Sequence, residues 1–181
     1  MAKLEEKKVS SKKAFSGRLL KLRVDTVKLP NGIRTTREVV EHPGAVTIIA
    51  LTDRTELVLV RQFRTAAGQV LLELPAGVPF RGEKGERTAK RELEEETGYR
   101  AKSVRKVYAG YASPGYSDEL IQFYFAKDLK KHKQMTEEDE LINVELVDLG
   151  LCLDLVRTGR IRDNKTVVGI MIARQIAGGD W

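Results

Sequence analysis

The sequence predicts a mixed α/β (α+β) domain, in which helices flank a mixed central sheet, preceded by an N-terminal β-hairpin extension. Several short runs rich in β-branched residues and leucine are separated by glycine and proline turn signals. Three further segments have helical apolar spacing and end at glycines. Because strands and helices do not alternate strictly, a mixed sheet is favoured over a purely parallel one.

The first 44 residues are expected to form the extension. Residues 1–14 are polar and are expected to be a frayed or loosely packed start. Strands are expected at 19–27 and 33–40, because the Pro-Asn-Gly sequence at 30–32 is a strong turn signal. A two-stranded hairpin is rarely stable alone, so this extension is expected to need further contacts.

Residues 45–181 are expected to form the main domain. Strands at 45–52 and 57–63 are continuous apolar runs, as expected for strands buried on both faces. A helix is expected at 86–97, where Ala89 and Leu93 are four residues apart and a glycine follows. The other expected elements are strands at 70–74, 104–111, 120–127 and 144–149 and helices at 151–158 and 167–177.

The composition is that of an ordinary globular protein. The chain has 181 residues, of which 41% are hydrophobic, enough for one domain with a core. No apolar run approaches the roughly 18 residues that cross a bilayer, and the amino terminus lacks the apolar core of a secretory signal. We therefore expect a cytoplasmic protein without a membrane partner. Cys152 is the only cysteine, so no internal disulfide can form.

The formal net charge is +6, which would suit nucleic acid or any phosphorylated small molecule. The lysines and arginines are spread along the chain, without the basic stripe and interleaved aromatic residues of single-strand binders. We therefore expect a small-molecule substrate and do not expect nucleic acid as a partner.

The most informative segment is residues 77–99, GVPFRGEKGERTAKRELEEETGY. On a helix, Glu92 faces both Glu95 and Glu96, and like charges at this spacing destabilise the helix by roughly a few tenths of a kcal/mol per pair. They also occupy the last turn, where the helix dipole favours cations. A bound divalent cation would explain the arrangement, since Mg²⁺ and Mn²⁺ prefer carboxylate, carbonyl and phosphate oxygens. The alternative is a solvated acidic face.

The spacing around the acidic run favours the metal site. It resembles the 23-residue box of the Nudix hydrolases, which has a glycine, five residues, a glutamate, seven residues and then Arg-Glu-hydrophobic-any-Glu-Glu-any-Gly-hydrophobic. Every fixed position is filled, by Gly77, Glu83, Arg91, Glu92, Leu93, Glu95, Glu96, Gly98 and Tyr99. The resemblance implies an α/β/α sandwich and cation-dependent hydrolysis of a diphosphate that links a nucleoside to another moiety.

The same resemblance implies a role for each polar residue of the box. The metal ligands would be Glu92, Glu95, Glu96 and the carbonyl of Ala76, for Mg²⁺ or for Mn²⁺ or another divalent cation. Arg91 would hold the carboxylates in place by charge-assisted hydrogen bonds, and we count it among the catalytic residues. Glu83 is expected to brace the loop against the helix.

Other segments resemble the ADP-ribose pyrophosphatase branch of that family; they are residues 37–46, 62–64, 72–77, 113–119 and 138–144. The resemblance implies cleavage of ADP-ribose to AMP and ribose 5-phosphate. Arg37 and Arg64 would contact the substrate, and Glu119 would accept hydrogen bonds from the terminal ribose. Glu140 or Glu138 would deprotonate the attacking water or hold the metal that does so. The alternative for Arg37 and Arg64 is a surface charge without function, and the alternative for Glu138 and Glu140 is a solvated loop position.

The branch also implies a homodimer, in which the N-terminal hairpin pairs with another subunit. Other interpretations of the chain remain open at this stage. One is a Nudix enzyme for another nucleoside diphosphate derivative, such as a nucleotide sugar or a dinucleotide. The others are a binding module that has lost catalysis, which the complete set of box carboxylates disfavours, and an RNA pyrophosphatase, which only the basic charge suggests.

Overall fold

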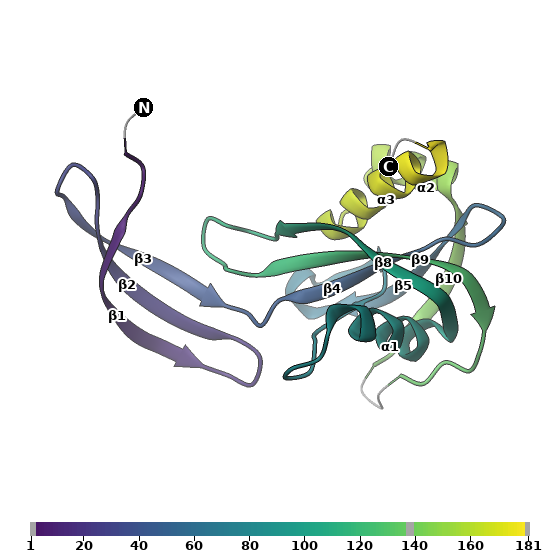
Figure 1. The fold of residues 1–181 in the computed structure, drawn as a ribbon, viewed down its shortest axis with the longest axis horizontal. Coiled ribbons are helices and arrows are strands. Elements are labelled where there is room, and N and C mark those ends of the chain that lie inside the picture. The colour runs from purple at the N-terminus through teal and green to yellow at the C-terminus, as the bar shows by residue number, and fades with distance from the viewer. Residues whose placement is uncertain (1–2, 137–139, 180–181) are drawn as a thin grey trace. The chain divides into compact units, whose positions relative to one another are not determined.

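The computed structural model describes residues 3–136 and 140–179 (Figure 1). The chain divides into two compact units. The first contains Met1–Gly44 and Tyr111–Leu120, and the second contains Ala45–Gly110 and Ile121–Trp181. The first unit therefore includes the loop Tyr111–Leu120, which is far in the sequence from the N-terminal residues of that unit. No local sequence pattern indicated that this loop belongs there.

The first unit is built on a three-stranded antiparallel sheet in the order β1-β2-β3. Its strands are β1 (Lys7–Ser16), β2 (Lys21–Lys28) and β3 (Arg34–Glu41). The expectation of a frayed start was wrong for residues 7–14, because β1 pairs with β2 along its whole length. Every residue of β1 is exposed, and two register shifts interrupt its pairing, so the strand shows no alternation of apolar and polar residues.

The loop Tyr111–Leu120 joins the first unit through backbone hydrogen bonds to the end of β3. The Val40 N–H donates to the carbonyl of Tyr116 at 2.8 Å, and the Asp118 N–H donates to the carbonyl of Val40 at 3.1 Å. The Asp118 carboxylate also accepts from the His42 N–H at 2.9 Å. These contacts fix the loop without burying apolar side chains.

The second unit holds two sheets and three helices. A four-stranded sheet has the order β7-β4-β9-β8, and a three-stranded sheet has the order β10-β5-β6. The pair β4–β9 is parallel, whereas β5 pairs antiparallel with both of its neighbours. The strands are β4 (Ala45–Ala50), β5 (Glu56–Arg64), β6 (Gln69–Glu73), β7 (Ala76–Gly77), β8 (Tyr99–Tyr111), β9 (Leu120–Lys131) and β10 (Asn143–Asp148).

The sheets lie between α1 (Gly85–Thr97) on one side and α2 (Leu149–Arg157) and α3 (Asn164–Gly178) on the other (Figure 1). A short 3₁₀ helix, η1 (Thr65–Ala67), links β5 and β6. The expected α/β/α sandwich with a mixed sheet is confirmed. Among the described residues, no helix has both the length and the apolar character needed to cross a membrane.

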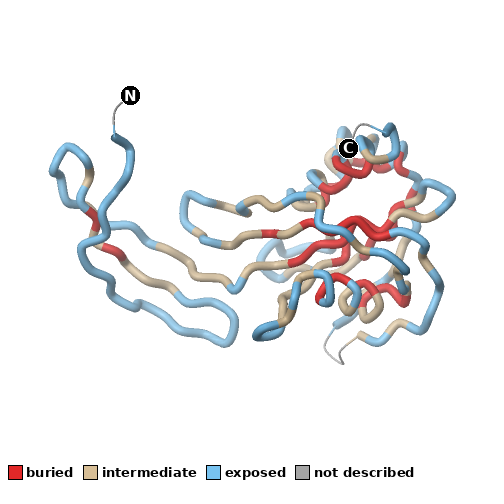
Figure 2. The backbone as a smooth tube through the Cα atoms, viewed as in Figure 1, coloured by how far each residue is buried: buried red, intermediate tan, exposed pale blue. Residues whose placement is uncertain are grey.

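The core lies along β4 and β5, where the buried backbone runs through the centre of the second unit (Figure 2). Of the apolar runs predicted for these strands, residues 46–50 and 57–60 are fully buried, including Ile48, Ile49 and Leu59, whereas Phe63 is 60% exposed. Ala89 and Leu93 of α1 form one buried cluster with Ile48 of β4. Burial of each large aliphatic side chain contributes about 1.5–3 kcal/mol, so this packing fixes the orientation of α1 on the sheet.

The ends of α1 follow its sequence signals. Gly98 terminates the helix in a left-handed conformation with φ of 67°, and its N–H donates to the carbonyl of Glu94 at 2.8 Å. β8 then begins directly at Tyr99, five residues earlier than the expected residue 104. With the Leu93 face of α1 packed in the core, the acidic residues of its last turns lie next to the short strand β7.

Candidate active site

Glu92 and Glu96 lie one helical turn apart on α1 and beside β7. The Glu96 carboxylate accepts a hydrogen bond from the Ala76 N–H at 3.1 Å. Gly77 leaves space for the Glu92 carboxylate, because a Cβ at this position would lie 2.0 Å from the Glu92 Cδ. The glycine of the box is therefore required by close packing of a carboxylate against the backbone.

Both carboxylates are removed from water, at 12% exposure for the Glu92 side chain and 5% for Glu96. Burial, reinforced by repulsion from Glu92, raises the pKa of Glu96 to about 8. Burial also raises the pKa of Glu92 to about 7, although the Arg91 charge opposes the shift. The charge of Glu140 raises both pKa values further. The positive charge of Arg91 and Arg64 therefore does not fully offset the burial and repulsion of these carboxylates, and a cation would supply further positive charge.

Arg91 ties the helix carboxylates to one another. Its Nη1 lies 2.8 Å from Glu92 Oε1 and donates to Glu95 Oε2 at 2.9 Å. Its Nε and Nη2 donate to the two oxygens of Glu83 at 3.2 and 3.1 Å, and its guanidinium carbon lies 4.0 Å from the centroid of the Phe80 ring. Arg91 thus orients two of the predicted ligands from one fixed position.

Glu83 connects the loop before α1 to the helix. Besides Arg91, its carboxylate accepts from the Phe80 N–H and from the Thr88 hydroxyl, each at 3.0 Å. The Arg91 hydrogen bonds are the largest of the effects that hold the pKa of Glu83 at about 2. Because its carboxylate oxygens already accept these hydrogen bonds, Glu83 holds the loop before α1 against the helix.

Arg64, expected to contact substrate, forms a two-point pair with Glu73. Its Nε and Nη2 donate to the two carboxylate oxygens at 2.9 and 2.7 Å. Its charge also lowers the pKa of Glu96, which places it near the acidic pair. Glu73, only 1% exposed, is a partner that our sequence reasoning missed. Its signal was a carboxylate inside the apolar strand run VLLEL.

The other predicted residues are distributed between the two units. Arg37 and Glu119 belong to the first unit, where Arg37 Nη2 donates to Glu6 at 2.6 Å and Glu119 lies 3.7 Å from the His42 ring nitrogen. Glu140 belongs to the second unit and is exposed, with its charge acting on Glu92 and Glu96. Glu138 lies outside the described residues. The second unit therefore brings together Glu92, Glu95, Glu96, Ala76, Arg91, Arg64 and Glu140.

Comparison with known families matches residues 41–165, well over half of the chain, to the NUDIX domain. The chain belongs to the Nudix family. Residues 6–40 match a second family, the nucleoside diphosphate sugar hydrolase N-terminal domain. The expected enzyme class, a Nudix hydrolase acting on a phosphoric anhydride bond, is thereby confirmed.

Two bacterial relatives are similar to this Nudix protein over nearly its whole length. A Bacillus subtilis (strain 168) protein named ADP-ribose pyrophosphatase is 43% identical over 172 residues, which cover 94% of this chain and 93% of the relative. A Bacillus methanolicus protein named methanol dehydrogenase activator is 43% identical over 173 residues, which cover 94% of each. A solved structure described as an ADP compounds hydrolase superposes with a TM-score of 0.86 at 22% identity, covering 98% of this chain and 97% of that one. This last likeness confirms the Nudix fold.

The predicted ligands of this Nudix site are not arranged as a ready-made metal cage. Among the described residues, no three carboxylate, histidine or cysteine side chains converge closely enough to enclose an ion. Glu95 is turned toward Arg91, and one oxygen of Glu96 is bound to the Ala76 N–H. A cation would have to compete with these contacts and draw the carboxylates together.

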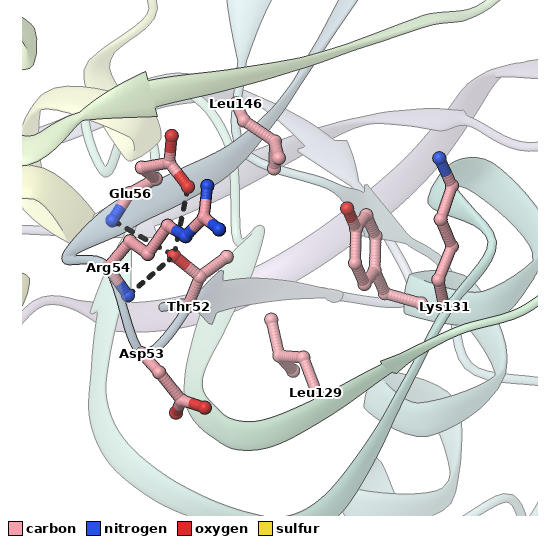
Figure 3. A pocket seen from close by; sticks show the side chains of 8 residues that line it. Thr52, Asp53, Arg54, Glu56, Leu129, Lys131 and Leu146 are labelled. Carbon is pink, nitrogen blue, oxygen red and sulfur yellow. Dashed lines mark hydrogen bonds between the residues drawn. The ribbon is translucent and has the colours of Figure 1, made fainter.

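A separate pocket of about 320 Å³ lies at the other end of β4 (Figure 3). Thr52, whose hydroxyl accepts from the N–H groups of Arg54 and Glu56, closes the turn between β4 and β5 at this pocket. None of the residues predicted to act in the Nudix reaction lines it. Its lining residues are Thr52, Asp53, Arg54, Glu56, Tyr99, Leu129, Lys131 and Leu146.

Proposed function

We propose that the protein is a Mg²⁺-dependent pyrophosphatase that hydrolyses ADP-ribose to AMP and ribose 5-phosphate. The observation that carries the proposal is the buried pair Glu92 and Glu96, held beside Gly77 with raised pKa values. The choice of ADP-ribose is supported by the 43% identity to the Bacillus subtilis protein of that name.

The proposed metal ligands are Glu92, Glu95, Glu96 and the carbonyl of Ala76. They fit a hard divalent cation, because they offer only oxygen atoms and because their buried carboxylates need positive charge. Mg²⁺ is the proposed ion, with Mn²⁺ as a substitute of similar ligand preference. When bound, the cation would neutralise diphosphate oxygens and activate water. Arg91 would keep Glu92 and Glu95 oriented toward the same point.

We assign the diphosphate contact to Arg64. An arginine has five N–H donors, of which the Glu73 pair uses two, so others remain for phosphate oxygens. The side chain is 41% exposed, which leaves it accessible to a ligand. Arg37 is proposed as a second substrate contact, and Glu119 as an acceptor for the terminal ribose hydroxyls.

Glu140 is the preferred base for the attacking water, with Glu138 as the alternative. A base must lie within hydrogen-bond reach of that water, next to the metal ligands. The charge of Glu140 acts on the pKa of both Glu92 and Glu96, which supports its nearness to the reaction. Exchange to glutamine at each position, measured by kcat in saturating Mg²⁺, distinguishes the two: the base variant loses orders of magnitude and the other does not.

Residues 1–44, which make up most of the first unit, are proposed to be a dimerising extension of the catalytic domain, residues 45–181. Large apolar side chains on and around the sheet of this extension are exposed, among them Phe15 at 59% and Val9 at 46%. A second copy of the chain would cover such surface. Sedimentation at micromolar concentration tests the proposal, and a monomer would contradict it.

A nucleotide sugar other than ADP-ribose is the second candidate substrate, favoured by the match of residues 6–40 to a domain of nucleoside diphosphate sugar hydrolases. Rates with ADP-ribose, GDP-mannose and NADH under Mg²⁺ would rank the substrates. Turnover in ¹⁸O-water would show whether the label enters AMP or ribose 5-phosphate.

Glu92→Gln tests the metal site and is expected to lower kcat by orders of magnitude while the protein stays folded. Glu86→Gln is the matched control, because Glu86 lies on the same helix but pairs with Lys90 in solvent. Near-normal turnover by Glu92→Gln would refute the metal assignment.

A further inference from the structure

Four charged side chains form a cluster where β6 meets the start of α3. Glu73 Oε2 is shared by two cations, Arg64 Nη2 at 2.7 Å and Lys165 Nζ at 2.5 Å. Lys165 Nζ also donates to Asp163 Oδ2 at 2.9 Å. The Lys165 side chain is 12% exposed and that of Glu73 is 1% exposed, so the contacts are largely shielded from water.

The Asp163 end of the cluster is fixed to the fold. Asp163 caps α3 by accepting from the Thr166 N–H at 3.0 Å and from the Thr166 hydroxyl at 2.6 Å. The Thr166 hydroxyl in turn accepts from the Leu74 N–H at 2.8 Å. The cap therefore joins α3 to the residues just before β7, the strand that contains the proposed metal ligand Ala76.

Stability alone does not account for the second cation. Burial favours the neutral form of Glu73, yet Arg64 and Lys165 together hold its pKa below the ordinary value. One bidentate arginine already satisfies both carboxylate oxygens, and buried ion pairs are weak evidence for a stabilising role. The distinctive effect of Lys165 is geometric: it fixes Glu73 Oε2, and Glu73 in turn fixes the plane of the Arg64 guanidinium.

We propose that Lys165 is a positioning residue for the diphosphate contact. It acts through Glu73 to orient Arg64, so that the remaining arginine donors point toward the substrate diphosphate. Lys165 itself does not touch the substrate. This inference rests on the proposed function, in which Arg64 binds the diphosphate.

A double-mutant cycle tests the proposal. Lys165→Met is made in the wild type and in Arg64→Met, and binding of α,β-methylene ADP-ribose is measured by calorimetry with Mg²⁺ present. Misplacement of a binding group by about 1 Å can lower rates by about a hundredfold, so a loss of about tenfold in affinity is expected for Lys165→Met in the wild type. In Arg64→Met the same exchange should change affinity by less than about twofold, because the group it positions is gone.

Two controls accompany the cycle. Lys90→Met removes a lysine–glutamate pair of 3.1 Å that lies in solvent, and should bind the analogue as the wild type does. The Mg²⁺ concentration for half-maximal turnover should not change in Lys165→Met, since Lys165 contacts none of the proposed ligands. If Lys165→Met melts below the assay temperature, the cycle is repeated at a lower temperature at which every variant is folded, with the same expected coupling.

The outcomes distinguish failure of the proposed role of Lys165 from failure of the proposed function. A wild type that cleaves ADP-ribose, together with strong coupling in the cycle, supports the role of Lys165. The same wild type with equal losses in both backgrounds, or with no loss, overturns the role of Lys165 and leaves the proposed function standing. A wild type that neither binds the analogue nor cleaves ADP-ribose overturns both.

Discussion

Replacing Glu96 by glutamine is expected to stabilise the metal-free protein while abolishing its activity. Glu96 is buried, its folded-state pKa is about 8, and the ordinary value is 4.5. When folding raises the pKa of a group, the contribution of that group to the free energy of unfolding is fully present at pH values below its pKa in the unfolded state. That contribution is lost as the pH rises through its pKa in the folded state. Glutamine resembles the protonated acid, keeps an acceptor for the Ala76 N–H and carries no charge at any pH.

The size of the effect follows from the shift. Each pH unit above 4.5 lowers the free energy of unfolding by about 1.4 kcal/mol until the pH approaches 8. The upper limit on the stability gained by Glu96→Gln at pH 7.5 is therefore about 4 kcal/mol. Coupling to Glu92 and local relaxation reduce this bound, and a gain of about 1–3 kcal/mol is expected. For a chain of this size that corresponds to a rise in Tm of roughly 3–9 °C.

The assay is thermal unfolding in EDTA at pH 5 and pH 7.5. Glu96→Gln should melt above the wild type at pH 7.5 and close to it at pH 5. Added Mg²⁺ should raise the Tm of the wild type more than that of the variant, since a ligand stabilises only the state that binds it. Glu86→Gln, on an exposed part of the same helix, should show neither effect. A variant less stable than the wild type at pH 7.5 in EDTA would refute the reasoning.

Three further exchanges test the surroundings of the site. Gly77→Ala should lower kcat by at least about tenfold with little change in Tm, because its Cβ would displace only the end of the Glu92 side chain; steady-state kinetics and thermal unfolding would check both. Glu94→Gln should keep turnover within about twofold, because the Glu94 carboxylate pairs with an exposed arginine on β8 and with no cation of the proposed site. Arg64→Met should raise the KM for ADP-ribose. Arg61→Met, which breaks a more exposed arginine–glutamate pair on the same strand, should not, and equal effects on KM would contradict the diphosphate role of Arg64.

The parts of the site that the sequence predicted are those encoded by local spacing. Glu92, Glu95 and Glu96 share one helix, and the packing of Ala89 and Leu93 decides which way that helix faces. Periodicity of apolar residues is visible in a sequence because the same geometry repeats every turn or every second residue. The buried stretches of β4 and β5 were predictable for another reason, because a continuous apolar run indicates a strand that is buried on both faces.

The parts that were missed depend on contacts between distant segments or on backbone pairing alone. Lys165 and Glu73 are separated by 92 residues, so no spacing rule joins them. β1 is held to β2 by main-chain hydrogen bonds with every side chain exposed, so its sequence shows no buried face. The loop Tyr111–Leu120 joins the first unit through the backbone of Val40, which also leaves no pattern in side chains.

The three helix carboxylates differ in how well the protein compensates their charge, and this difference predicts their order of importance for metal binding. Glu95 and Glu92 each contact Arg91, whereas within the described part of the chain the Glu96 carboxylate forms no salt bridge and accepts only from the Ala76 N–H. A cation therefore relieves the largest electrostatic penalty at Glu96. Mg²⁺ titration by calorimetry should show a loss of affinity of about tenfold or more for Glu96→Gln and a smaller loss for Glu95→Gln. The reverse order would mean that Arg91, rather than burial, sets the affinity of the site.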